Sequence, residues 1–234
     1  MSKKRQSRPS ARPSIHDRIA LRFSLSRYFD GIWIGSLRGK PEDLARVEEA
    51  LLLIGQHSPL NYARIARELD RIWVALSFHG LAYHERALKA CVLDERFLND
   101  PATTIARIAS TIVHEATHAR LERYGIEYGE ELRTRIEAIC FRRELAFAVR
   151  LPDSTELQQE IGRYLEWYPA NPDLFSDAHF RETHISGGVE ALRYLGTPDW
   201  FIRALLVSLP MVRSARRFFS FAWLRTRGAR KPIT

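Results

Sequence analysis

The chain has 234 residues, of which 45% are hydrophobic, enough for one sizeable core with appended tails. Its two cysteines, Cys91 and Cys140, exclude a disulfide framework and a four-cysteine zinc site. The net charge of +8 is unevenly spread: residues 1–28 carry eight Lys or Arg and one Asp, and residues 203–234 carry eight Lys or Arg and no acid. Residues 29–202 therefore hold 20 basic and 27 acidic side chains, so an acidic middle lies between basic ends.

The two basic ends determine which partners and which compartment we expect. The polar leader contains no signal-peptide hydrophobic region, and the apolar run 204–212 is too short to span a bilayer. We therefore expect a cytoplasmic protein whose basic ends are attracted to phosphate-rich surfaces. Aromatic and leucine side chains accompany the arginines after residue 200, which favours peripheral association with an anionic membrane over nucleic-acid binding. The sequence carries no signal for an oligomeric state.

Hydrophobic periodicity predicts a central domain of residues 29–197. A basic, partly disordered arm of residues 1–28 precedes it, and a basic, aromatic, helical tail of residues 198–234 follows it. Residues 15–34 are interpreted as a short helix or an ordered arm. Helices are predicted over residues 41–54, 60–69, 101–124, 130–150 and 154–165. Strands are predicted over residues 71–78 and 90–94, with residues 81–83 pairing between them.

A His-Glu-Ala-Thr-His pentad occupies residues 114–118, within the predicted helix 101–124. Residues four apart in a helix lie one above the other, so His114 and His118 present neighbouring imidazoles to one site. Glu115 points about 100° further round the helix axis, which leaves its carboxylate beside a metal ion rather than on it. The pentad therefore predicts one bound Zn2+, with Glu115 as the general base that takes a proton from water.

A catalytic zinc site needs a third protein ligand, and the geometry of the next helix selects Glu137. If this helix, 130–150, runs antiparallel to the first, a rise of about 1.5 Å per residue places residues 135–139 level with the two histidines. Glu137 lies in this window, whereas Glu144 falls roughly 8 Å too far along the helix. The alternative is that Glu137 is an ordinary surface acid paired with Arg133.

The two histidines and Glu115, followed after eighteen residues by Glu137 in the run Arg-Ile-Glu-Ala, resemble the gluzincin division of the zincin metallopeptidases. The match covers roughly residues 71–150, where the pattern is similar to the compact minimal gluzincins. The metzincin pattern fails, because Leu121 and Tyr124 stand where it requires a glycine and a histidine. The resemblance implies an α+β, zincin-like fold, in which a small, mostly antiparallel sheet packs on an active-site helix and a following glutamate helix, with additional C-terminal helices.

The resemblance also implies a zinc metallopeptidase that acts on a peptide or protein substrate. The strand before the active-site helix would then be an edge to which an extended peptide adds through backbone hydrogen bonds. That strand is Ala90, Cys91, Val92, Leu93 and Asp94. Hydrolysis further requires a hydrogen-bond donor to the oxyanion, and residue chemistry offers His184, Tyr124 and Tyr128. His57, His79 and His84 are interpreted as turn or surface histidines.

Two other functions are compatible with the same residues. One is a non-catalytic zinc-binding protein that docks on an anionic membrane or on nucleic acid through its basic ends. In the other, the pentad binds no metal, and His114 and His118 are merely packed or face solvent. Metal content and activity distinguish these functions, because only the hydrolase requires both the metal and Glu115.

Overall fold

The computed structural model describes residues 13–78 and 80–207. Contacts divide the chain into two compact units, residues 1–187 and 188–234. The first unit holds the sheet and the predicted metal ligands. Residues 25–28, predicted as part of a basic arm, belong to a strand of this sheet. In the predicted tail, residues 199–207 are helical, and residues 208–234 lie outside the described part of the chain.

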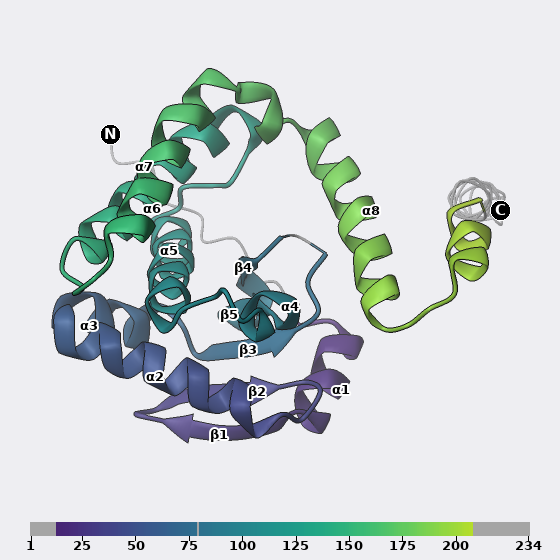
Figure 1. Cartoon of the computed structure of the whole chain (residues 1–234), viewed down its shortest axis with the longest axis horizontal. Coiled ribbons are helices and arrows are strands. Elements are labelled where there is room, and N and C mark those ends of the chain that lie inside the picture. The colour runs from purple at the N-terminus through teal and green to yellow at the C-terminus, as the bar shows by residue number, and fades with distance from the viewer. Residues whose placement is uncertain (1–12, 79, 208–234) are drawn as a thin grey trace, which may run out of the picture. The chain divides into compact units, whose positions relative to one another are not determined.

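The first unit contains a five-stranded sheet in the order β1-β2-β3-β5-β4 (Figure 1). Its strands are β1 (Leu25–Phe29), β2 (Ile32–Ser36), β3 (Arg71–Ala75), β4 (Ala82–Glu85) and β5 (Ala90–Asp94). The inner pairings, β2 with β3 and β3 with β5, are parallel, and the outer pairings are antiparallel. The α+β class is confirmed, but the sheet is mixed rather than mostly antiparallel. Helices connect β2 to β3, and such a crossover allows the two strands to run in the same direction.

The hairpin of β1 and β2 was not predicted from the sequence, although a turn signal is present. Asp30 and Gly31 connect the strands, and both have positive φ angles, 46° and 82°. An Asp-Gly pair with these angles fits the two-residue turn whose twist matches that of the flanking strands. The hairpin places the end of the predicted arm at one edge of the sheet.

The opposite edge of the sheet is β4, not β5. All five residues of β5 are buried, and β5 pairs with β3 on one side and with β4 on the other. The prediction that residues 90–94 form an edge strand is therefore wrong. After β4 the chain turns back through a short 3-10 helix, Arg86–Leu88, and Lys89 with φ 46°, so β4 pairs on the outside of β5. Strand order depends on this reversal, which hydrophobicity does not reveal.

The helices labelled in Figure 1 are α1 (Ile15–Phe23), α2 (Pro41–His57), α3 (Pro59–Glu68), α4 (Glu95–Asn99), α5 (Ile105–Arg123), α6 (Glu130–Ala148), α7 (Thr155–Ala170) and α8 (Asp177–Tyr194), with a 3-10 turn at Pro172–Phe175. Of these, α2, α4 and α5 contact the sheet. The helix predicted from residue 101 begins at Ile105, because the Thr104 side chain caps it by accepting the Arg107 backbone N–H. No helix of the described residues is long and apolar enough to span a membrane.

The main core lies where α5 meets α2 and the sheet. Ile108 and Ile112 of α5 are fully buried in a cluster with Leu51 of α2, Ile72 of β3 and Leu93 of β5. Burial of such side chains stabilises the fold by about 1.5–3 kcal/mol each. This core fixes one face of α5, so the next face, with the pentad histidines, is held against α6.

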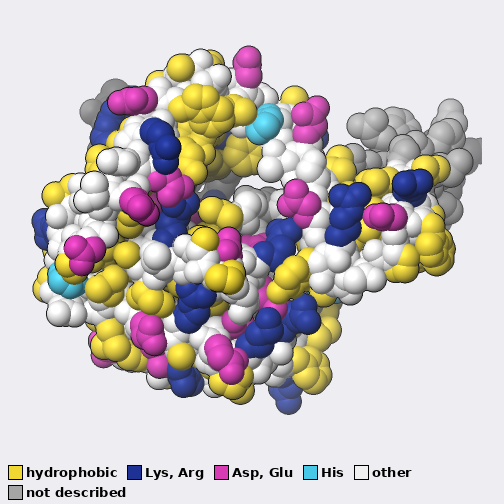
Figure 2. All heavy atoms as spheres, viewed as in Figure 1, with side chains coloured by type: hydrophobic (Ala, Val, Ile, Leu, Met, Phe, Trp, Pro, Cys, Tyr) yellow, Lys and Arg dark blue, Asp and Glu magenta, His cyan; other side chains and the backbone are white. Residues whose placement is uncertain are grey.

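Figure 2 shows acidic and basic side chains interspersed on the visible surface rather than one charge sign dominating.

Alanine substitutions at two glycines are expected to change stability in opposite directions. Gly35 of β2 lies under the Trp33 indole, and a Cβ there would lie 2.0 Å from a ring carbon. Gly35→Ala should therefore lower the free energy of unfolding by about 1–3 kcal/mol, because the ring must leave its packed position. Gly162 of α7 has no atom within 4 Å of its Cβ position, so Gly162→Ala should raise stability by about 0.5–1 kcal/mol. Urea unfolding followed by circular dichroism measures both changes, and a stabilised Gly35→Ala variant would contradict the assigned packing.

Candidate metal centre

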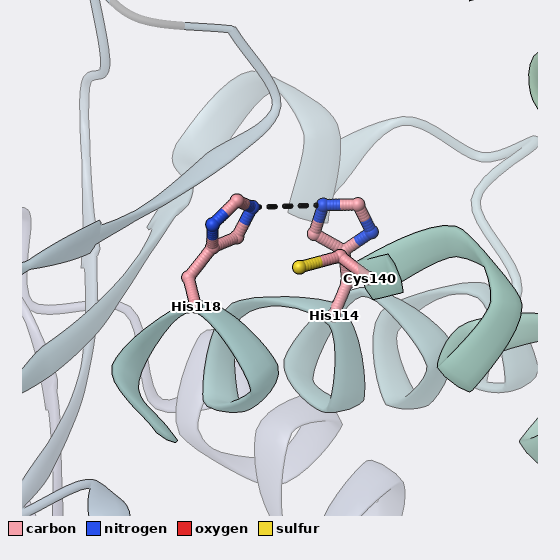
Figure 3. Close-up of side chains that lie close together, drawn as sticks. All are labelled: His114, His118 and Cys140. Atoms are coloured by element: carbon pink, nitrogen blue, oxygen red, sulfur yellow. Dashed lines mark hydrogen bonds between the residues drawn. The ribbon is translucent and has the colours of Figure 1, made fainter. Parts of the chain in front are cut away.

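Helix α5 carries the pentad, and its two histidines lie on the face next to α6. His114 and Glu115 are both 6% exposed, and the side chain of His118 is 15% exposed. The two imidazoles lie one turn apart, with ring centroids separated by 5.0 Å and their Nε2 atoms by 3.2 Å (Figure 3). The spacing of four residues therefore brings two nitrogen donors to one buried point, as the pentad predicts.

Helix α6 places the Glu137 carboxylate at the same point. Its Oε2 lies 3.2 Å from His114 Nε2, and its Oε1 lies 3.4 Å from His118 Nε2. Glu137 is buried, so it is not the surface acid of the alternative interpretation. The antiparallel pairing of the two helices explains the contact, because it brings the middle of α6 level with the pentad.

The spacing of these donor atoms fits a tetrahedral zinc site. Zinc binds imidazole nitrogen and carboxylate oxygen at roughly 2.0–2.2 Å, which separates neighbouring tetrahedral ligands by roughly 3.3 Å. The three separations among His114 Nε2, His118 Nε2 and the Glu137 oxygens are 3.2, 3.2 and 3.4 Å. Two imidazoles and one carboxylate are also a usual donor set of catalytic zinc. The residues present therefore fit the ion.

Cys140 is a further possible donor, and sequence analysis did not identify it as one. Ligand atoms of His114, His118 and Cys140 all lie within 4.8 Å of one another, and Figure 3 shows the Cys140 sulfur beside the two rings. Burial and the nearby carboxylates of Glu137, Glu115 and Glu144 raise the pKa of the Cys140 thiol well above its usual range. Without a metal it stays a neutral thiol. Its position three residues after Glu137, on the same helix face, is the signal that could have revealed it.

Glu144 holds His114 from the side opposite Glu137. His114 Nδ1 lies 3.0 Å from Glu144 Oε2, and the Ser110 hydroxyl donates to the other oxygen of Glu144 at 2.9 Å. The sequence estimate that placed Glu144 too far along the helix is wrong, because it counted backbone levels only. Helical side chains lean towards the N-terminus, so in α6 the Glu144 carboxylate reaches back towards His114. This contact orients the ring with Nε2 towards the shared point.

Electrostatics in this cluster favour one protonated imidazole between two carboxylates. Burial alone would lower the pKa of His114, but hydrogen bonds to Glu137 and Glu144 outweigh it and raise that pKa well above the usual value. Burial would likewise raise the pKa of Glu137, but hydrogen bonds from His114 and His118 hold it far below its usual range. A proton at His114 therefore offsets the negative charge of the Glu137 and Glu144 carboxylates.

Glu115 differs from the other two acids because it has no partner. Among the residues that the structure describes, its carboxylate makes no hydrogen bond or ion pair, although it is buried. Burial raises the pKa of Glu115, the imidazoles of His118 and His114 oppose that rise, and Glu137 and Glu144 add to it.

The three predicted oxyanion donors lie in different places. Tyr128, in the loop before α6, donates a hydrogen bond from its hydroxyl to Glu137 Oε1. Its ring packs edge-on against the His118 ring, with ring centroids 5.4 Å apart. Tyr124 follows α5, where its ring lies under the guanidinium groups of two neighbouring arginines, Arg120 and Arg123. His184 lies on α8 and packs edge-on against Phe78. The structure therefore brings Tyr128 to the predicted metal ligands, in contact with both His118 and Glu137.

His84 connects the edge strand β4 to helix α5 through a contact with Glu122. Predicted as a turn or surface histidine, it lies instead on β4, with its side chain 10% exposed. Its Nδ1 is 3.3 Å from Glu122 Oε2, and Arg86 Nε is 2.6 Å from the other oxygen of Glu122. Burial, followed by the charges of His118 and Arg86, lowers the pKa of His84 to about 4. Glu122 follows His118 by one turn of α5, so these contacts hold β4 beside His118.

Comparison of the chain with protein-family models, with curated proteins and with solved structures finds no match.

Zinc binding should release a proton at neutral pH. The raised pKa of His114 leaves its ring protonated in the metal-free protein, and a metal ligand must be neutral. Calorimetric zinc titrations at pH 7, in buffers of different ionisation enthalpy, should report release of about one proton per zinc from this ring. Affinity should weaken as the pH falls. Binding without proton release would show that His114 is already neutral and contradict the charge assignment.

Replacing Glu144 should weaken zinc binding without removing a ligand. Glu144→Gln keeps the shape of the side chain but removes the charge that orients His114, so zinc affinity should fall by roughly 10- to 100-fold. Glu131→Gln, an exposed glutamate on the same helix, is the matched control and should bind zinc as the wild type does. Equal affinities of the two variants in a competitive chelator titration would show that Glu144 does not support the site.

Proposed function

We propose that this protein is a zinc-dependent metallohydrolase that cleaves peptide bonds, with His114, His118 and Glu137 as zinc ligands and Glu115 as general base. The observation that carries the proposal is the convergence of the His114, His118 and Glu137 donor atoms beside Glu115. Ordinary packing does not explain why three such donor atoms from two helices converge on one point. The resemblance of the motif to the gluzincins supports the same assignment.

The chain's own residues divide the chemistry between them. A bound zinc ion would supply Lewis acidity and lower the pKa of water at the site. Glu115 takes the proton from the attacking water and later delivers it to the leaving amine. Its raised pKa suits this exchange, because a stronger base accepts the proton more readily. Glu144 and Ser110 keep the His114 ring oriented, and Tyr128 fixes the Glu137 carboxylate by its hydrogen bond.

A peptide substrate is supported by the free edge of β4. In the described part of the sheet, β4 pairs only with β5, so its other side offers backbone donors and acceptors to an extended chain. Strand addition binds a peptide by its main chain and demands little of its side chains. Because His84 and Glu122 fasten β4 beside His118, a peptide on this edge would pass close to the metal ligands.

A second candidate, a non-catalytic zinc site, is favoured by the position of Cys140. Four protein ligands close a tetrahedral site and leave no position for water, as structural zinc sites do. A set of His114, His118, Glu137 and Cys140 would have that character, because the cysteine sulfur lies within 4.8 Å of the histidine donors. Against it, burial keeps Cys140 a neutral thiol, whereas zinc binds thiolate.

Glu115→Gln should separate the two candidates. The amide keeps the size of the side chain but cannot take a proton, so hydrolysis of a broad peptide panel should fall by roughly 100- to 10,000-fold. Zinc content should remain near one equivalent, because Glu115 is not a ligand in this proposal. Glu131→Gln serves again as the matched control. Equal activity of the wild type and Glu115→Gln, with zinc fully bound in both, would remove the hydrolase proposal.

The absorption spectrum of the cobalt-substituted protein tests the closed site. Cobalt takes the place of zinc and gives a strong thiolate-to-metal absorption band only when sulfur is bound. We expect no such band and an unchanged spectrum in Cys140→Ser. A thiolate band that disappears in Cys140→Ser would establish a four-ligand site and favour the non-catalytic candidate.

A further inference from the structure

A small cavity lies between α3, α5 and α6, beside the metal ligands but lined by different residues. It has a volume of about 90 Å3. Its apolar walls come from Val113, Ala116 and Leu121 of α5, Ile65 of α3 and Ile139 of α6. Its polar lining consists of Asn61, Arg64, Thr117, Arg120 and Arg143. Three arginines from three different helices therefore line one small space, and none of the residues proposed to act on zinc lines it.

No acid among the described residues neutralises these three arginines. The cavity has no carboxylate in its lining, and Arg64, Arg120 and Arg143 take part in no ion pair with any residue that the structure describes. Glu68, the buried acid of α3, is paired elsewhere: Arg67 contacts it at 3.1 Å and Arg123 at 2.7 Å. The positive charge of the cavity is therefore left uncompensated by this part of the protein.

The arginines also repel one another. Burial lowers the pKa of Arg64, and the charges of Arg143, Arg120 and Arg67 lower it further. Like charges held close together destabilise a fold unless an opposite charge lies between them. Arg143 is exposed and Arg64 and Arg120 are partly buried, so solvent screens part of this repulsion, and an anion bound between the three groups would offset the rest.

The wall of the cavity is mostly apolar, and the polar groups in it are mainly hydrogen-bond donors. Arg64 donates to Asn61 Oδ1 at 3.3 Å, so the Asn61 oxygen is already occupied by a donor. The Thr117 hydroxyl is committed to the backbone carbonyl of Val113 at 2.8 Å. Guanidinium groups present forked N–H pairs that match the oxygens of phosphate or carboxylate. A volume of about 90 Å3 leaves room for a group larger than a single water molecule.

We propose that this cavity, formed by Arg64, Arg120, Arg143 and Asn61, is a binding site for a phosphate group, either free or at the end of a phosphomonoester. It is separate from the zinc chemistry and does not depend on it. A bound phosphate joins α3, α5 and α6 through charge-assisted hydrogen bonds. Because α5 and α6 carry all the metal ligands, its occupancy stabilises the helix pair that forms the metal centre.

Calorimetric titration of the full chain with inorganic phosphate, at constant ionic strength set by chloride, tests the proposal. The titration is run on metal-free and on zinc-loaded protein, because phosphate also binds zinc. We expect binding in both forms and a rise in melting temperature with phosphate. Arg64→Gln and Arg143→Gln should each weaken binding about tenfold, since each removes a charge-assisted contact. Arg142→Gln, an exposed arginine next to Arg143 and outside the cavity, should bind as the wild type does.

Glycerol 3-phosphate in a parallel titration distinguishes the two sources of the phosphate group. Tighter binding of inorganic phosphate supports a free ion, and tighter binding of the ester supports the end of a larger molecule. The proposal is overturned if metal-free protein binds neither ligand. It is equally overturned if the double variant Arg64→Gln, Arg143→Gln is folded by circular dichroism and binds phosphate as tightly as the wild type.

Discussion

The cluster of ionisable groups between α5 and α6 constrains everything around it. Glu137, Glu144 and His114 are buried and His118 is partly buried beside them, and charges taken out of water are tolerated only when they are paired or bind a metal. The histidine–glutamate contacts each join α5 to α6, so the helices must keep one register. The apolar core under α5 supplies the rigidity for this, because packed interiors resist sliding.

Three adjacent faces of helix α5 contact three different parts of the protein. One face packs on α2 and the sheet, one presents His114 and His118 to α6, and one borders the arginine cavity. Val113 and Thr117 of that cavity directly precede the two histidines in the chain. A change in the cavity therefore acts on the same helical turns that hold the metal ligands. The proposed phosphate site and the proposed zinc site share a support without sharing a side chain.

The contrast among three buried glutamates explains how one helix pair could both bind a metal and catalyse. Glu137 is held ionised by the imidazoles, Glu144 is occupied by His114 and Ser110, and Glu115 has no partner among the described residues. Glu137 and Glu115 are identical side chains whose pKa values shift in opposite directions because their neighbours differ. In the proposed function Glu137 is the ligand, Glu144 orients His114 and Glu115 is the base.

The sequence by itself determined the features that arise from the regular geometry of a helix. The four-residue spacing of the histidines and the 1.5 Å rise that selects Glu137 are local properties, and the structure brings these residues together. Tertiary structure decided the rest. The chain reversal after β4 makes β4 the sheet edge, the lean of the Glu144 side chain brings it to His114, and Cys140 and the three arginines gain neighbours from other elements. These contacts depend on strand order and side-chain direction across elements, which periodicity along one segment does not encode.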